Sequence, residues 1–131
     1  MTGETVTVKV PSKAGYLAVL RTAVGGFAAR DSFTLDQVDD LRLAVEETAV
    51  QLLRRSSGDH IVMDVTTTDG GIEVRLIIEV EGDEPVMDQS SFSWTILWAL
   101  TDDIQVESWP GHATVILRKN RLVIAQREQG E

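Results

Sequence analysis

Residues 34–80 read TLDQVDDLRLAVEETAVQLLRRSSGDHIVMDVTTTDGGIEVRLIIEV, and the spacing of their hydrophobic residues changes once within this stretch. In the first part these residues recur every three or four positions, which predicts an amphipathic helix over 34–55 that is capped by Thr34. In the second part they alternate, which predicts two strands at 61–67 and 72–80 joined by a glycine-rich hairpin turn. The inward stripe of the helix is expected to comprise Val38, Leu41, Val45, Ala49 and Leu52.

The N-terminal segment predicts one more strand and one more helix. Residues 5–10 alternate as a strand does, and Pro11 is expected to end it. Ser12 is then expected to cap a helix that runs to about Arg30. The inward residues of this helix are expected to be Leu17, Leu20, Val24 and Phe27, and Gly25-Gly26 suggests close packing late in it.

The C-terminal part predicts a short helix at 92–100 and a second hairpin of strands at 104–109 and 113–117. The resulting element order is strand, helix, helix, strand, strand, helix, strand, strand. It predicts an α+β two-layer sandwich, with a mostly antiparallel sheet and its helices on one face. The length suits a single domain over 1–131, with a core at about 5–118 and a tail at 119–131.

The composition excludes several kinds of site. The chain has no cysteine and only two histidines, so disulfides, a thiolate nucleophile and a cysteine- or histidine-rich metal site are not expected. No apolar run is long enough to span a membrane. The N-terminal sequence lacks the pattern of a signal peptide, so a cytoplasmic location without membrane contact is expected.

The charge is strongly negative and unevenly distributed. The chain has 12 Lys and Arg against 21 Asp and Glu, and residues 76–117 hold eight of the acids and no Lys or Arg. Direct nucleic-acid binding is not expected, because phosphate contacts require the opposite charge. A basic protein partner fits this segment, and a merely solubilising acidic surface fits it equally.

Two features of the helices could carry function. Glu47 and Gln51 are four residues apart and therefore share one face, where a carboxylate and an amide could act together or could simply be solvated. Trp94 and Trp98 have the same spacing on the helix at 92–100, which is typical of core packing or of a partner surface.

Two long stretches resemble the RsbW-like anti-sigma factors, which include serine-protein kinases. They are VPSKAGYLAVLRTAVGGFAARDSFTLDQVDDLRLAVEETAVQLLRR at 10–55 and SFSWTILWALTDDIQVES at 91–108, the latter similar to the actinobacterial anti-sigma-F branch. The resemblance extends over roughly 5–118. It implies the Bergerat-type ATP-binding fold that histidine kinases, gyrase and the Hsp90 chaperone share, with ATP and magnesium as cofactors.

The resemblance also assigns family positions to individual residues. Glu47 falls at the glutamate that serves as base, and Gln51 falls where the family has a magnesium-binding asparagine. Glu81 falls at the adenine-binding aspartate of an Asp-x-Gly-x-Gly motif. Ser91 and Ser93 replace the glycines of a Gly-x-Gly motif whose amides bind phosphate. Because only Glu47 keeps the family residue, these positions predict an impaired nucleotide site.

Three functions follow from the resemblance and these departures from it. The first is an anti-sigma factor that sequesters an alternative RNA polymerase sigma factor and is released from it by an anti-anti-sigma (STAS) protein. The second is an active kinase that phosphorylates that STAS protein, and the third is an unrelated binding domain on the same fold. Arg21 falls at an arginine that contacts both partners in the family, although by itself it is an ordinary helix-surface cation. A homodimer is also expected, through the strand at 5–10 and the helix after it.

Overall fold

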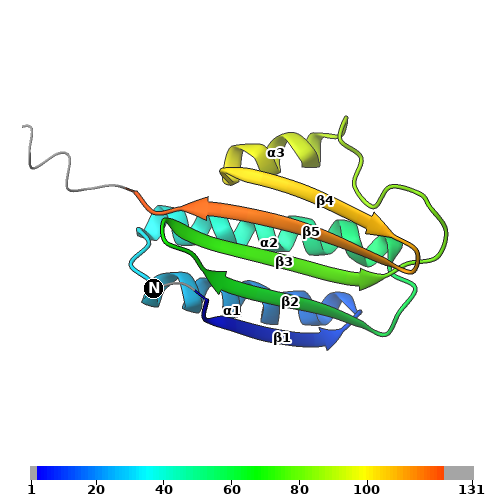
Figure 1. Ribbon diagram of the computed structural model, residues 1–131, viewed down its shortest axis with the longest axis horizontal. Coiled ribbons are helices and arrows are strands. Elements are labelled where there is room, and N and C mark those ends of the chain that lie inside the picture. Colours follow the sequence, from blue (N-terminus) through cyan, green and yellow to red (C-terminus); the bar gives the residue numbers. More distant parts are fainter. Residues whose placement is uncertain (1–2, 123–131) are drawn as a thin grey trace, which may run out of the picture.

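The computed structural model describes residues 3–122 and contains one five-stranded sheet with three α-helices (Figure 1). The strands are β1 (Thr5–Pro11), β2 (His60–Thr67), β3 (Gly71–Glu79), β4 (Asp103–Trp109) and β5 (His112–Asn120). All neighbouring strands are antiparallel, in the order β1-β2-β3-β5-β4. The helices are α1 (Leu17–Arg30), which follows a 3₁₀ turn at Ala14–Tyr16, α2 (Leu35–Arg55) and α3 (Phe92–Leu100).

The helices α1 and α2 cover one face of the sheet, and α3 lies beside the β4 edge (Figure 1). This arrangement confirms the predicted α+β class, its two layers and its antiparallel sheet. Within residues 3–122, no helix is both long enough and apolar enough to cross a membrane.

The helix α2 begins and ends where the sequence predicts. Thr34 Oγ1 accepts a hydrogen bond from the Gln37 backbone N–H at 3.1 Å, and Gln37 Oε1 accepts one from the Thr34 N–H at 3.2 Å. This reciprocal capping box satisfies two of the free amides of the first turn. The five residues of the predicted stripe are all buried, and Ala44 and Thr48 are fully buried with them.

The start of α1 differs from the prediction. The Ser12 hydroxyl donates to the Gly58 carbonyl at 2.7 Å, so it is not available as a cap. The residue at the N-cap position is Tyr16, whose side chain makes no capping hydrogen bond. The four predicted inward residues of α1 are nevertheless buried. Close packing occurs at Gly25, where a Cβ would lie 2.8 Å from the Arg42 side chain, but not at Gly26.

The core lies between the sheet and the two long helices. Alternate residues of β2, β3 and β5 point toward the helices, as the period of two requires. The fully buried members of this layer are Ile61, Met63, Val65, Ile72, Val74, Leu76, Ile78, Ala113, Val115 and Leu117. Each large aliphatic side chain removed from water in this way contributes about 1.5–3 kcal/mol.

The last strand extends two residues past the predicted core boundary at 118. Lys119 is only 9% exposed, and its ammonium donates to Asp40 at 3.2 Å and to the Leu100 carbonyl at 2.8 Å. Gln37 Nε2 donates to the Asn120 carbonyl at 2.7 Å. These contacts tie the end of β5 to α2 and α3. The predicted tail at 119–131 therefore begins inside the sheet, and residues 123–131 lie outside the described residues.

Gly71 begins β3 at the point where the chain lies closest to β5. A Cβ at this position would lie 2.0 Å from the Lys119 carbonyl oxygen and 2.8 Å from the Asn120 Cα. Both of these atoms belong to backbone, which cannot turn aside as a side chain can. A glycine is therefore required here by the close approach of the two strands.

We expect Gly71→Ala to lower the free energy of unfolding by about 1–3 kcal/mol, because the added methyl group forces β3 and β5 apart. The neighbouring Gly70 is a matched control, since a Cβ there has no atom within 4 Å. Gly70→Ala is expected to change stability by no more than about 0.5 kcal/mol. Urea unfolding of the two variants measures the difference, and equal stabilities would contradict the steric explanation.

Candidate functional site

Three of the predicted site residues meet between α2 and α3. The Ser93 hydroxyl donates to Glu47 Oε2 at 2.5 Å, and Gln51 Nε2 donates to the same oxygen at 3.2 Å. Gln51 Nε2 also lies 3.1 Å from Ser93 Oγ. The three side chains therefore form a closed polar cluster, which we call the 47–51–93 cluster.

The helices determine this geometry. Glu47 and Gln51 are one turn apart on α2, and Ser93 lies in the first turn of α3. The Ser91 side chain caps α3 by accepting from the Trp94 backbone N–H at 3.1 Å. Leu97 is fully buried and anchors the helix against α2. The predicted i to i+4 pair thus forms, and a residue from a segment 42 positions away completes it.

The cluster does not fit magnesium ATP. The Glu47 carboxylate already accepts two hydrogen bonds, and Gln51 directs its donor, not its oxygen, toward it. Magnesium requires oxygen ligands in strict octahedral geometry. The cap formed by Ser91 uses the Trp94 amide, one of the N-terminal amides of α3 that a phosphate would need. Among the described residues, no three His, Asp or Glu side chains are placed to hold a metal ion.

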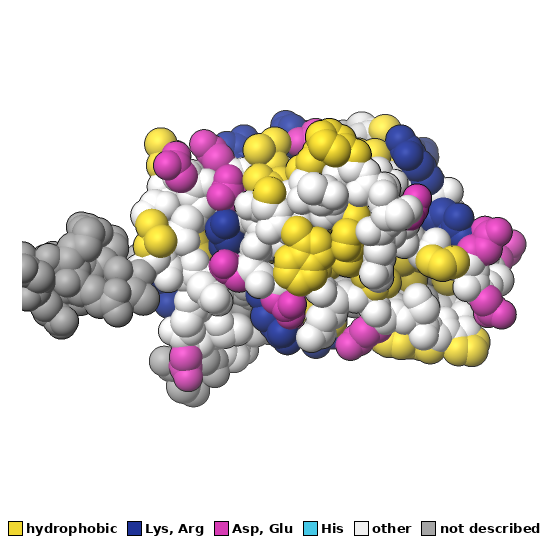
Figure 2. Space-filling view, turned by 90° about the horizontal axis from the view of Figure 1, so that it is seen from above, with side chains coloured by type: hydrophobic (Ala, Val, Ile, Leu, Met, Phe, Trp, Pro, Cys, Tyr) yellow, Lys and Arg dark blue, Asp and Glu magenta, His cyan; other side chains and the backbone are white. Residues whose placement is uncertain are grey.

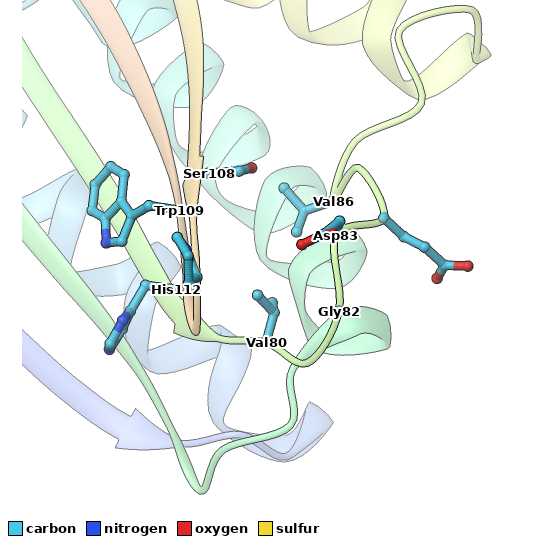
Figure 3. Close-up of a pocket in the computed structure, with 9 residues that line it drawn as sticks. Val80, Gly82, Asp83, Val86, Ser108, Trp109 and His112 are labelled. Atoms are coloured by element: carbon cyan, nitrogen blue, oxygen red, sulfur yellow. The ribbon is translucent and has the colours of Figure 1, made fainter.

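Glu81, the residue at the predicted adenine-binding position, lies apart from this cluster. It is exposed in the loop between β3 and α3, where Gly82 adopts a positive φ of 79°. A hollow of about 250 Å³ lies beside this loop and is lined by Asp83, Val86 and the β4–β5 turn, but not by Glu81. Trp109 and His112 project from that hairpin to the side opposite Asp83 and Val86 (Figure 3).

The electrostatics around α3 also disfavour a triphosphate. Residues 76–117 contribute no Lys or Arg. Lys119, whose ammonium contacts the last residue of α3, is paired with Asp40 at 3.2 Å. Arg55 is paired with Glu84 at 2.5 Å, and Arg118 with Asp103 at 3.2 Å. Hydrogen bonds from the Ser90 hydroxyl and backbone N–H lower the pKa of Asp88, so its carboxylate remains charged. Magnesium would offset only about half of the triphosphate charge of roughly −4.

Arg21 lies in a separate place, between α1 and α2. Its Nη1 donates to Glu46 Oε1 at 2.9 Å, and the two side chains are 34% and 39% exposed. Its Nε is buried and has no hydrogen-bond partner among the described residues. Arg21 also lines a hollow of about 300 Å³ together with Arg42 and Leu43. The guanidinium is therefore held in place and retains free donors.

Two contacts at this site could not be found by pattern alone. The hydroxyl of Ser93 closes the cluster, and the only signal for this was a hydroxyl residue at a position where the family has glycine. The buried ammonium of Lys119 holds the C-terminal end of α3, and no motif around Lys119 in the sequence indicates this contact. Trp94 and Trp98, which the sequence places one turn apart, contact each other with their rings edge to face and 6.2 Å apart.

Comparison with known proteins confirms the resemblance to RsbW. The anti-sigma-F factor RsbW of Mycobacterium tuberculosis is 33% identical over 112 residues, which cover 76% of this chain and 60% of that protein. The serine-protein kinase RsbW of Bacillus velezensis is 29% identical over 86 residues, which cover 64% of this chain and 54% of that protein. The chain thus spans about 60% or less of the length of these relatives. No family profile matches it.

The fold has a match among solved structures. A crystal structure of the RsbU and RsbW domains of a Mycobacterium tuberculosis protein aligns with a TM-score of 0.71. The alignment covers 93% of this chain and 35% of the other, at 14% sequence identity. This likeness supports the Bergerat-type architecture that the resemblance implied, and at this identity it shows the fold alone.

Proposed function

We propose that this RsbW-like chain is a cytoplasmic anti-sigma factor, which sequesters an alternative sigma factor until an anti-anti-sigma protein of the STAS type binds the chain and frees the sigma factor. The similarity to an anti-sigma-F factor supports the sigma partner. The acidic segment at 76–117 supports a basic protein partner and disfavours direct contact with nucleic acid.

The closed 47–51–93 cluster is the observation that supports binding without phosphoryl transfer. Such transfer depends mostly on positioning and on neutralising charge, which magnesium and phosphate-binding groups supply. Here the Glu47 carboxylate accepts hydrogen bonds from Ser93 and Gln51. Among the described residues, no group of acidic or histidine side chains is placed to hold a metal ion beside it. Removal of one electrostatic stabiliser typically slows a reaction about 100- to 1000-fold, and several positions differ here.

Kinase activity is the second candidate function. It is favoured by the retained Glu47 and by the similarity to a serine-protein kinase. In that case Glu47 would serve as the base that accepts the proton of a serine hydroxyl of the STAS protein. Gln51 would have to rotate its side-chain amide so that the oxygen faces the magnesium ion. Both candidates share the sigma partner, so a phosphorylation assay separates them.

We expect sigma-factor binding to be independent of ATP and of Glu47. In calorimetric titrations with each alternative sigma factor of the host, one should bind, and magnesium ATP should change its dissociation constant less than about threefold. Glu47→Gln is nearly isosteric, keeps an acceptor for Ser93 and should bind equally well.

The same proteins test the kinase directly. Labelled phosphate on the STAS protein that disappears with Glu47→Gln would establish the kinase and refute the proposal of binding alone. Absence of labelling with both proteins, together with unchanged sigma binding, is the result that we expect.

We expect Arg21 to contact the sigma factor directly. Arg21→Ala should weaken binding at least about 30-fold, which corresponds to about 2 kcal/mol for a buried hot spot. Glu46→Ala is the matched control, because it breaks the same intramolecular ion pair and keeps the Arg21 side chain available to the partner. Equal losses in the two variants would show that the ion pair supports the fold and that Arg21 itself makes no contact.

We also propose a two-fold homodimer through β1 and α1. β1 lies at one edge of the sheet, and its Val6 side chain is 45% exposed. An edge strand of this kind presents unpaired backbone groups to a second copy. Sedimentation velocity at tens of micromolar should give a species of twice 14.4 kDa. A monomer at that concentration would contradict the proposal.

A further inference from the structure

α3 exposes an unusual amount of apolar surface for a helix at the protein surface. Its nine residues, FSWTILWAL, include no charged side chain, and only Leu97 among them is buried. Phe92 is 78% exposed and Trp98 is 43% exposed. Thr95 lies between them by helical spacing, so the two aromatic rings flank one continuous face. Large exposed aromatics grouped in this way are typical of an interaction surface.

This face is held rigid at both ends of the helix. At the N-terminal end Ser93 is bonded to Glu47 of α2, and at the C-terminal end the Leu100 carbonyl accepts from the buried ammonium of Lys119. Between them Trp94 stacks edge to face on Trp98. A partner that binds here would therefore find the surface already ordered, and little conformational entropy would be lost on binding.

The loop before α3 adds a hollow and negative charge. Pro85, Met87 and Asp88 line a hollow of about 430 Å³ together with the next residue of the loop. Asp83 and Asp88 belong to an acidic segment without Lys or Arg, and neither forms an ion pair with any residue in 3–122. Figure 2 looks onto this side and shows hydrophobic side chains exposed in the middle of the face, with acidic side chains at the right-hand end.

We propose that α3 and the loop at 81–91 form a docking surface for a basic, DNA-binding region of the sigma factor. The inference rests on the proposed function and names the surface that carries it. DNA-binding regions must present Lys and Arg to neutralise phosphates. Apolar anchors with acids at one end are complementary to such a region, with the rings supplying buried area and the carboxylates steering the encounter.

The competing occupants are less well matched to this surface. A second copy of this chain would bring its own eight acids against the same segment, and like charges would repel. A nucleic acid would be repelled for the same reason. The occupant must therefore be positively charged and must also contain apolar groups that cover Phe92 and Trp98. This surface is separate from the hollow beside Arg21, which lies between α1 and α2.

The first test measures how tightly the sigma factor identified by calorimetry binds to one variant of this surface and to its control. Phe92→Ala should weaken binding at least about tenfold, because it removes an anchor. Its matched control is Leu35→Ala, since Leu35 is equally exposed, at 77%, but lies at the start of α2. The control should stay within about twofold of the natural sequence. Circular dichroism of both variants should be unchanged, since neither side chain is buried.

The charged part of the surface is tested by salt dependence. The double substitution Asp83→Asn with Asp88→Asn should weaken binding about tenfold at low salt and flatten the dependence of affinity on salt. Its charge-matched control is Asp59→Asn with Asp69→Asn, since both of these residues are exposed in turns outside the acidic segment.

The outcomes separate this inference from the function on which it rests. If no sigma factor binds the natural sequence, the proposed function fails and the docking surface fails with it. If a sigma factor binds and both surface variants bind as well as their controls, the function stands and the docking surface is wrong. If instead the surface variants bind the sigma factor normally but no longer bind the STAS protein, a different partner occupies this surface and the inference is also wrong.

Discussion

The packing of α2 on the sheet is the contact on which the other parts of the molecule depend. Its buried stripe includes small residues, among them Ala44, Thr48 and Ala49, all of which are fully buried. Small side chains let the helix lie close to the sheet and let α1 and α3 pack alongside it. Because the stripe fixes the rotation of the helix, it also fixes where the polar residues at its borders point.

Three polar contacts then connect α2 to three other elements. Glu46 pairs with Arg21 of α1, Glu47 accepts from Ser93 of α3, and Asp40 pairs with Lys119 of β5. All three carboxylates lie at the edge of the buried stripe, where solvent screening is weaker than on an open surface. The helix therefore organises both the core and the polar features to which we assign function.

The sequence predicted the elements well because hydrophobic period and turn residues carry that information locally. The bounds of α2 and α3 agree with the prediction, since Thr34 and Ser91 supply caps within the helices' own segments. The cap assigned to Ser12 was wrong because its hydroxyl bonds to Gly58, a residue 46 positions away. The contact between Ser93 and Glu47 has the same separation and was missed for the same reason. Local patterns do not record such distant pairings.

The buried ammonium of Lys119 has a mechanical consequence. A single cation joins Asp40 in the second turn of α2 to the last carbonyl of α3, and the adjoining Asn120 is bonded to Gln37 one turn earlier. The corner between α1 and α2 lies at this same end, where Arg121 pairs with Asp31. A displacement of that corner is therefore transmitted to the C-terminal end of α3 through these charged and hydrogen-bonded contacts. A ligand that binds at the corner would therefore displace the C-terminal end of α3 as well, and a ligand that binds α3 would displace the corner.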